Sequence, residues 1–432
     1  MELNSLEFKS KKCITISNKR IIIKDTFLLD LTCLFWLSNT PLRLLLAKFL
    51  GVFGIGGYTI PILVIIIYFP LIIYIFKTKK IPWKYFHWIF IITVIFFGVT
   101  LYINPEYEHW YSRDIYGIVY TIFRPDHGAI WAFLMIEISH TPERIFNNLK
   151  NYSIVLFCYD MLLLLQNQSL GYWTAFGETG EIIEKSYSLD FGYDMIFISL
   201  IVLTYFFNKK KYKWAYLCFA GFLILLALTY GSRGALLCLG VFIILYLFNG
   251  QQSKIKKMLY SVILIITGLF TYNKGVEIIQ NTAIYLLNNF NISSRTLMKI
   301  ASGDIMDDSG RDSIYRLVKQ AIENNPWGYG AYGDRPLIGP SFYWGYSHSI
   351  VYEMMINFGV ILGVLFLLFL SIKSVCLVFF SKDKYIIFTM MIVFSMTMRL
   401  IISDTFWGNI YFWILLSILF IFRVHLKFRR DN

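Results

Sequence analysis

The sequence predicts an all-α polytopic membrane protein of about twelve transmembrane helices, with one long extracytoplasmic loop containing short helices. Hydrophobic residues make up 57% of the 432 residues and charged residues only 16%, whereas soluble domains carry about 45–50% and about 25%. Apolar stretches of about 20 residues, the length that crosses a bilayer, recur along the chain. A single long hydrophilic stretch, residues 273–347, interrupts them.

Hydropathy divides the expected transmembrane helices into two groups, one on each side of the hydrophilic stretch. Helices 1–9 fall within residues 26–272 and helices 10–12 within residues 349–424. The first contains Pro41, and the fourth contains Arg124 followed by Pro125. A proline is tolerated where neighbouring groups satisfy the carbonyl that it frees. The expected ranges are near 26–49, 57–76, 84–103, 115–139, 149–166, 189–207, 213–230, 233–249, 258–272, 349–372, 385–402 and 407–424.

Basic residues indicate how the chain is oriented. They cluster in alternate connectors, and the positive-inside rule places such connectors in the cytoplasm. We therefore expect two cytoplasmic tails, residues 1–25 and 425–432, and an extracytoplasmic loop, residues 273–347. Because this pattern explains the net charge of +13, we expect no nucleic-acid partner. The basic clusters lie at residues 9–20, 77–80, 144–150, 209–211, 254–257, 382–384 and 427–430.

The hydrophilic loop contains a predicted amphipathic helix at residues 311–323. Its apolar residues recur at i, i+3, i+4, i+7 and i+8, which places them on one face. Arg311 would lie in the first turn, where a guanidinium and free backbone N–H groups suit a phosphate or pyrophosphate. The alternative is a surface salt bridge between Arg311 and a nearby aspartate. The apolar residues are Ile314, Leu317, Val318, Ala321 and Ile322.

Further candidate residues follow in and just after the loop. The run 328–333 combines three glycines with Tyr329 and Tyr332, whose flat faces and hydroxyls suit a sugar; the alternative is a flexible loop. His348 is the side-chain type best suited to proton transfer near neutral pH, and the alternative is a structural capping role. Glu353 follows, and an ionisable residue close to the membrane is a functional candidate.

Arginines form the other group of candidates. Arg233 lies in the expected outer hairpin 231–234, and together with Arg311 and Arg399 it could meet one anionic ligand. The alternative for Arg233 is snorkelling to lipid phosphates. Arg124 is a further candidate. Because the chain has no HExxH, CxxC, DxD or Walker A motif, we expect no metal site and no cofactor.

Four short motifs make this chain resemble the superfamily of O-antigen polymerases and O-antigen ligases. The likeness is strongest between residues 225 and 365, and the N-terminal half is similar in topology only. The chain departs from the family pattern at Ser349, where the family often has asparagine. The motifs are SRG at 232–234, SGR at 309–311, NPWGYG at 325–330, and His348 ahead of a helix that ends in NFG at 357–359.

The resemblance implies a metal-independent glycosyltransferase of the membrane-embedded GT-C kind. Its donor would be an undecaprenyl-pyrophosphate-linked oligosaccharide held among membrane lipids, and a chain-length regulator protein would be a partner. The enzyme would lie in the cytoplasmic (inner) membrane with its active site on the extracytoplasmic side. Arg233 and Arg311 match the arginines that hold the pyrophosphate. His348 matches the histidine that activates the acceptor hydroxyl or supports the leaving group.

Within this superfamily, a polymerase of O-antigen or capsule repeat units is favoured over a ligase. A ligase that builds lipopolysaccharide must also bind a lipid A–core acceptor, and the loop, with six basic residues against six acidic ones between 295 and 335, offers no strongly basic surface for it. A lipid-linked oligosaccharide transporter is less favoured, because it would predict charges throughout the bundle centre, broken helices and short loops. A structural or signalling membrane protein is a further alternative.

Overall fold

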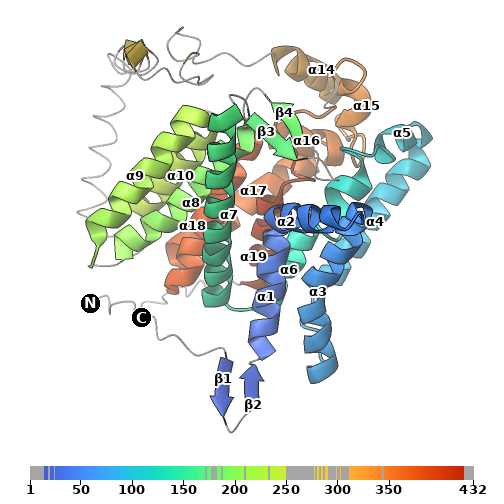
Figure 1. Cartoon of the computed structure of the whole chain (residues 1–432). Coiled ribbons are helices and arrows are strands. Elements are labelled where there is room, and N and C mark those ends of the chain that lie inside the picture. Colours follow the sequence, from blue (N-terminus) through green and yellow to red (C-terminus); the bar gives the residue numbers. More distant parts are fainter. Residues whose placement is uncertain are drawn as a thin grey trace, which may run out of the picture.

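The computed structural model describes residues 14–17, 20–23, 25–170, 173–176, 182–185, 188–208, 211–231, 234–249, 311–342 and 345–422, with isolated residues between 277 and 302. These residues are almost entirely helical (Figure 1). The described strands form two antiparallel hairpins, β1 (Ile14–Ser17) with β2 (Arg20–Ile23) and β3 (Trp173–Phe176) with β4 (Ile182–Lys185).

Six helices of the described part are long and apolar enough to cross a membrane, as a polytopic membrane protein requires. Two shorter apolar helices, α10 (Gly234–Phe248) and α19 (Ile410–Ile421), coincide with the predicted eighth and twelfth spans. The predicted ninth span, 258–272, lies outside the described residues. The six candidate spans are η1 with α3 (Gly56–Thr78), α4 (Phe86–Ile103), α8 (Leu189–Asn208), α9 (Lys213–Tyr230), α17 (Val360–Phe380) and α18 with η5 (Lys384–Ile401).

The predicted first span, 26–49, is wrong as a single helix. The chain forms α1 (Asp25–Leu37), turns at Ser38, and continues as α2 (Asn39–Val52), which runs across the bundle rather than along it (Figure 1). Pro41 explains the break, because its ring has no N–H for the preceding turn and is tolerated only in the first turn of a new helix.

The predicted fourth span, 115–139, is also interrupted. It consists of a π-helical turn, η3 (Val119–Phe123), and a separate helix, α6 (Trp131–Ser139). Arg124 is extended because the residue before a proline avoids the helical region. The indole N–H of Trp36 and the hydroxyl of Tyr68 donate to the Pro125 carbonyl at 3.0 and 2.9 Å, so α1 and α3 satisfy the broken backbone.

The predicted tenth span, 349–372, is divided into α16 (Ile350–Phe358) and α17 by Gly359. Gly359 has φ of +81°, and a Cβ there would lie 2.6 Å from the Trp327 carbonyl oxygen. The NPWGYG segment packs against this break, where the Val360 N–H donates a hydrogen bond to the Pro326 carbonyl at 2.9 Å. Only glycine combines this dihedral with such close backbone approach.

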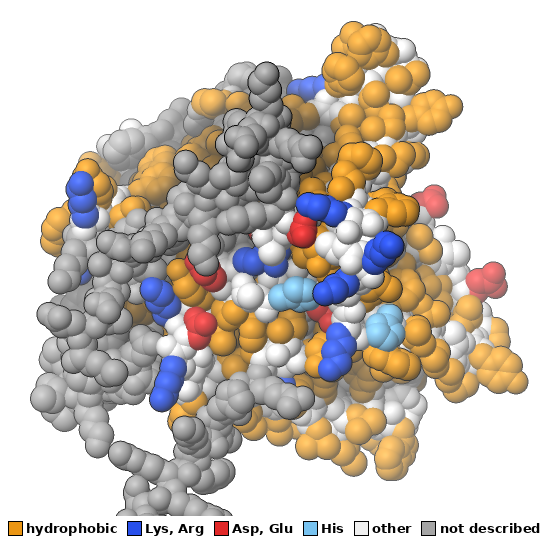
Figure 2. Space-filling view, turned by 90° about the horizontal axis from the view of Figure 1, so that it is seen from below, with side chains coloured by type: hydrophobic (Ala, Val, Ile, Leu, Met, Phe, Trp, Pro, Cys, Tyr) orange, Lys and Arg blue, Asp and Glu red, His pale blue; other side chains and the backbone are white. Residues whose placement is uncertain are grey.

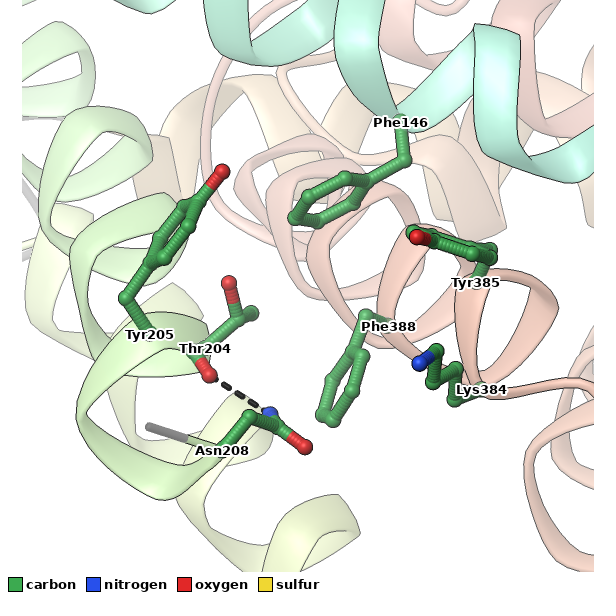
Figure 3. A pocket seen from close by; sticks show the side chains of 7 residues that line it. All are labelled: Phe146, Thr204, Tyr205, Asn208, Lys384, Tyr385 and Phe388. Atoms are coloured by element: carbon green, nitrogen blue, oxygen red, sulfur yellow. Dashed lines mark hydrogen bonds between the residues drawn. The ribbon is translucent and has the colours of Figure 1, made fainter. Parts of the chain in front are cut away.

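One end of the bundle, here named the connector end, gathers the described basic connectors. Lys77 pairs with Asp25 at 2.6 Å, and Arg144 at the start of α7 (Pro142–Leu170) pairs with Asp30 at 2.9 Å. Lys and Arg side chains stand out on this face (Figure 2). A pocket of about 10 Å³, near Lys384, lies between α7, α8 and α18 at the same end (Figure 3).

The opposite end, here named the loop end, holds the described helices of the hydrophilic loop. The predicted amphipathic helix is confirmed as α14 (Arg311–Asn324), which ends two residues before Pro326. Its buried residues Ile314 and Val318 pack with Ile338 and Ile356. The loop also contributes the short helix α15 (Asp334–Ile338). Two short helices from the connection after α4, η2 (Pro105–Tyr107) and α5 (Glu108–Tyr111), lie at the same end (Figure 1).

Candidate functional site

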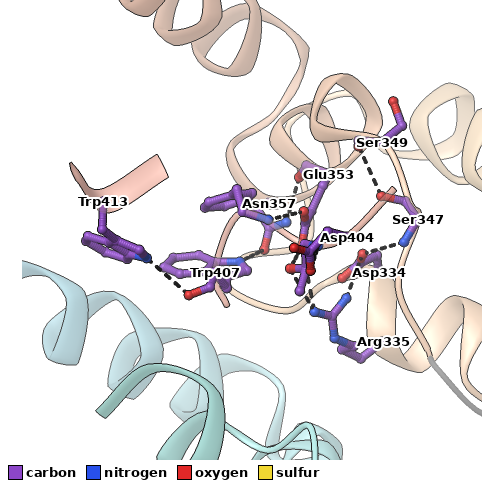
Figure 4. Close-up of polar contacts among 11 residues, drawn as sticks. Asp334, Arg335, Ser347, Ser349, Glu353, Asn357, Asp404, Trp407 and Trp413 are labelled. Carbon is purple, nitrogen blue, oxygen red and sulfur yellow. Dashed lines mark hydrogen bonds and ion pairs between the residues drawn. The ribbon is translucent and has the colours of Figure 1, made fainter. Parts of the chain in front are cut away.

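A buried network of charges holds the loop end together (Figure 4). The Arg335 guanidinium pairs with Asp334 at 2.9 Å and lies 3.6 Å from the carboxylate of Glu353. It also donates to the Thr405 hydroxyl at 3.1 Å. Arg335 is 3% exposed and both carboxylates are fully buried, so these charges compensate one another rather than face a ligand.

Glu353 connects this network to the segment between η5 and α19. Its carboxylate accepts hydrogen bonds from the Thr405 hydroxyl and, at 3.0 Å, from the Phe406 N–H. Asp334 accepts from the Ser347 N–H at 3.0 Å. Glu353 was a candidate substrate-binding residue, but a fully buried carboxylate with these partners positions the segments around it instead.

A second group of residues, here named the loop cluster, consists of Arg311, Tyr346 and His348. Arg311 begins α14 and donates to the Ile402 carbonyl. No carboxylate of the described residues lies within 4.0 Å of its guanidinium. This finding disfavours the salt-bridge interpretation as far as Asp312 is concerned. An uncompensated guanidinium at the start of a helix is suited to an anion.

His348 lies beside Tyr346 and within electrostatic reach of Arg311. Its ring centroid is 4.1 Å from that of Tyr346, and its Nδ1 is buried with no hydrogen-bond partner. Burial, followed by the nearby positive charges of Arg311 and Arg335, lowers the pKa of His348 to about 4. A histidine with this pKa is neutral at pH 7, so an unpaired ring nitrogen can accept a proton.

Arg233 lies outside the described residues. Its sequence neighbour Gly234 begins α10, and a Cβ there would lie 2.8 Å from a side-chain carbon of Ile402. Ile402 is the residue whose carbonyl accepts from Arg311. The first residues of α10 and α14, Gly234 and Arg311, therefore both lie against Ile402.

The charge of Arg399, unlike that of Arg311, is compensated by carboxylates. Arg399 pairs with Asp404 at 3.1 Å and Asp190 at 3.3 Å, and stacks over the Tyr193 ring at 4.4 Å. The prediction that Arg399 shares one anionic ligand with Arg311 is therefore not supported by its charge environment. Arg399 instead lines a cavity of about 520 Å³.

This cavity, here named the central cavity, lies between the α1–α2 break, α7, the start of α8 and the segment that leads into α19. His127, just after the interrupted fourth span, also lines it. Arg124 pairs with Asp126 at 2.9 Å, and Asp126 contacts His127 at 3.0 Å. Arg124 thus reaches the edge of the cavity through two intermediate side chains.

The two predicted sugar-binding tyrosines have structural partners. The hydroxyl of Tyr329 donates to the Ala321 carbonyl at 3.0 Å, and its N–H donates to the Ile356 carbonyl at 2.6 Å. Tyr332 has no exposed surface, and Arg335 stacks over its ring at 4.3 Å. Tyr332 therefore packs in the core.

Sequence reasoning missed several residues of the loop end: Asp334, Arg335, Tyr346 and Thr405. The adjacent opposite charges of Asp334 and Arg335 were the available signal, but spacing does not show that both are buried. No group of three or more metal-ligating side chains occurs in the part of the chain that the structure describes. Comparisons with protein-family models, curated proteins and solved structures find no match to this chain.

Proposed function

We propose that this protein is a metal-independent polysaccharide polymerase that joins lipid-linked repeat units at the loop end. The observation that carries the proposal is the loop cluster, where a guanidinium that pairs with no described carboxylate acts electrostatically on a neutral histidine with an unpaired nitrogen. The residues involved, Arg311 and His348, are those that the resemblance to O-antigen polymerases singles out.

In the proposed reaction, a hydroxyl of the acceptor repeat unit attacks the anomeric carbon of the donor sugar. The bond between that carbon and the pyrophosphate oxygen breaks, and the hydroxyl proton passes to His348. Arg311, with Arg233, neutralises the charge that develops on the undecaprenyl pyrophosphate. The products are a glycan longer by the transferred chain and free undecaprenyl pyrophosphate.

We further infer that the connector end faces the cytoplasm and the loop end faces the opposite side of the membrane. The described basic connectors gather at one end, as the positive-inside rule predicts for a cytoplasmic face. The twelve-span arrangement with both termini in the cytoplasm belongs to this proposal. A cytoplasmic membrane location follows from the lipid carrier.

A lipid-linked oligosaccharide transporter is a second candidate that two observations favour. The fourth span is broken at Arg124, and the central cavity contains Asp160, Asp194 and Arg399. Interrupted helices around a charged cavity are features of transporters. The proposed polymerase differs in its need for His348.

The test compares surface glycans of a deletion strain that carries no plasmid, the intact gene, or its His348→Ala or His348→Gln form. For a polymerase, deletion leaves a single repeat unit on the acceptor, and neither histidine variant restores the ladder. Long glycan that stays on the lipid carrier would instead identify a ligase. Repeat units trapped on the cytoplasmic side of the membrane would identify a transporter.

The matched control is His109→Ala, because His109 belongs to α5 and lies outside the loop cluster. All variants must reach the membrane at wild-type levels, as measured by immunoblot. A full ladder with His348→Ala at normal expression would disprove the catalytic role of this histidine.

A further inference from the structure

The residues that line the central cavity take no part in the reaction proposed for the loop cluster. It is lined by the carboxylates of four aspartates and by several aromatic side chains. Its volume of about 520 Å³ falls within the range of about 300–1,000 Å³ that small-molecule sites occupy. The four carboxylates belong to Asp160, Asp190, Asp194 and Asp404.

The charges of this cavity are unevenly compensated. Arg399 pairs with Asp190 and Asp404, whereas none of the described cations lies within ion-pair distance of Asp160 or Asp194. The guanidinium of Arg399 is thus already engaged by two carboxylates, which separates this cavity from the pyrophosphate-binding role proposed for the loop cluster.

Asp160 is the most informative residue of the cavity wall. It is 2% exposed, and its Oδ2 has no hydrogen-bond partner. Leaving a buried carboxylate oxygen unpaired is costly unless a ligand or ion supplies a donor. The unpaired oxygen thus points to a ligand with a strong hydrogen-bond donor, for which an ammonium group is best suited.

Aromatic side chains and amides of the cavity wall indicate the other chemical features of the ligand. Trp36, Tyr159 and Tyr411 line the same cavity, and such rings attract a cation and the apolar face of a sugar. The amides of Asn39 and Asn409 also line it, and amides hydrogen-bond to hydroxyls. A hydroxyl-rich ring that bears a positive charge fits all of these groups.

We propose that the central cavity binds a sugar unit of the acceptor and selects one that carries a free amino group. This inference rests on the proposed polymerase function, because it assigns the acceptor side of that reaction. It separates the two substrates by charge: the donor pyrophosphate lies among the arginines, and the acceptor sugar lies among the carboxylates.

Ligand-observed NMR on the purified full chain in detergent micelles tests this proposal with three probes: methyl glucosaminide, methyl glucoside and methyl glucuronide. We expect the amino sugar to bind at least tenfold more tightly than the neutral sugar, and the anionic sugar not to bind. Asp160→Asn should weaken amino-sugar binding at least tenfold. The control Glu143→Gln, an exposed acid at the other end of α7, should leave it unchanged.

Thr40→Trp provides a second test, should Asp160→Asn not fold. Thr40 is exposed and lines the cavity, so a bulky residue there obstructs the space without changing any charge. We expect Thr40→Trp to weaken the binding of both the amino sugar and the neutral sugar.

Several outcomes would overturn the proposal. Equal binding of the three probes, or amino-sugar binding that neither Asp160→Asn nor Thr40→Trp alters, would show that the central cavity is not the acceptor site, whatever the glycan ladder shows. Amino-sugar binding that depends on Asp160, together with a full ladder from His348→Ala, would retain the cavity as a sugar site and reject the catalytic function. The two proposals therefore fail separately.

Discussion

The guanidinium of Arg311 donates a hydrogen bond to the main-chain carbonyl of Ile402, 91 residues further along the chain. This contact attaches α14 to the segment that carries Arg399 and Asp404, which line the central cavity. The loop cluster and the central cavity are thereby held next to each other. A reaction between a donor in one and an acceptor in the other needs this proximity.

Replacing Arg311 should impair glycan transfer more than it impairs folding. We expect Arg311→Ala to lower the rate of polymerisation by about 100-fold or more, the usual effect of removing a donor to a developing charge. Arg311→Lys should restore part of the rate, because the charge remains but the planar fork is lost. Arg316→Ala, an exposed arginine of the same helix, is the matched control and should keep the wild-type rate.

The pH dependence of activity should reflect the lowered pKa of His348. A histidine that acts as a base must be neutral, so activity is present above its pKa of about 4 and falls as the pH drops through that value. Arg311→Gln removes one of the positive charges that disfavour protonation. The pKa of His348 should then rise, and the acid limb of kcat/KM should move to higher pH.

NMR titration of histidine-labelled protein, with His348→Gln used for assignment, measures the same shift directly. An acid limb near the ordinary histidine pKa of about 6.5 in the wild-type protein, or one that Arg311→Gln leaves in place, would contradict this prediction.

Glu353→Ala should strongly destabilise the loop end. The substitution leaves the Phe406 N–H and the Thr405 hydroxyl without their acceptor and removes a carboxylate beside Arg335. Breaking a buried charge pair from one side costs about 3 kcal/mol or more. Thermal unfolding in detergent micelles measures the loss, and Glu353→Gln, which keeps an acceptor oxygen, should lose less. Equal stability of the alanine variant and the wild type would exclude the positioning role.

Gly359→Ala should destabilise the protein by about 2 kcal/mol, because an extended backbone with positive φ, here φ of 81° and ψ of 162°, costs a non-glycine residue about 1–3 kcal/mol. The new Cβ would also press on the Trp327 carbonyl. Gly98→Ala in α4 is the matched control: no atom lies within 4 Å of its added Cβ, and alanine favours a helix by about 1 kcal/mol. The unfolding temperatures of both variants test this pair, and a loss with Gly98→Ala similar to that with Gly359→Ala would contradict it.

Local patterns were sufficient to predict much of the secondary structure. The spacing of Ile314, Val318 and Ala321 placed α14 correctly, since it depends only on the 3.6-residue period of a helix. Hydropathy likewise located six long apolar helices. Hydropathy also predicted α1 with α2, and α16 with α17, as single spans. The apolar composition continues through Pro41 and Gly359, and hydropathy contains no information about a change of helix direction.

The sequence by itself determined that this chain is a membrane protein with a polar loop that carries arginines and is followed by a histidine. Only the tertiary structure decided which charges are free: Arg399 is compensated by Asp190, 209 residues away, whereas no described carboxylate pairs with Arg311. It also buried Tyr332 and left an oxygen of Asp160 unpaired at a cavity. Hydropathy is a sum over neighbouring residues, but the compensation of a charge depends on which distant groups the fold brings together.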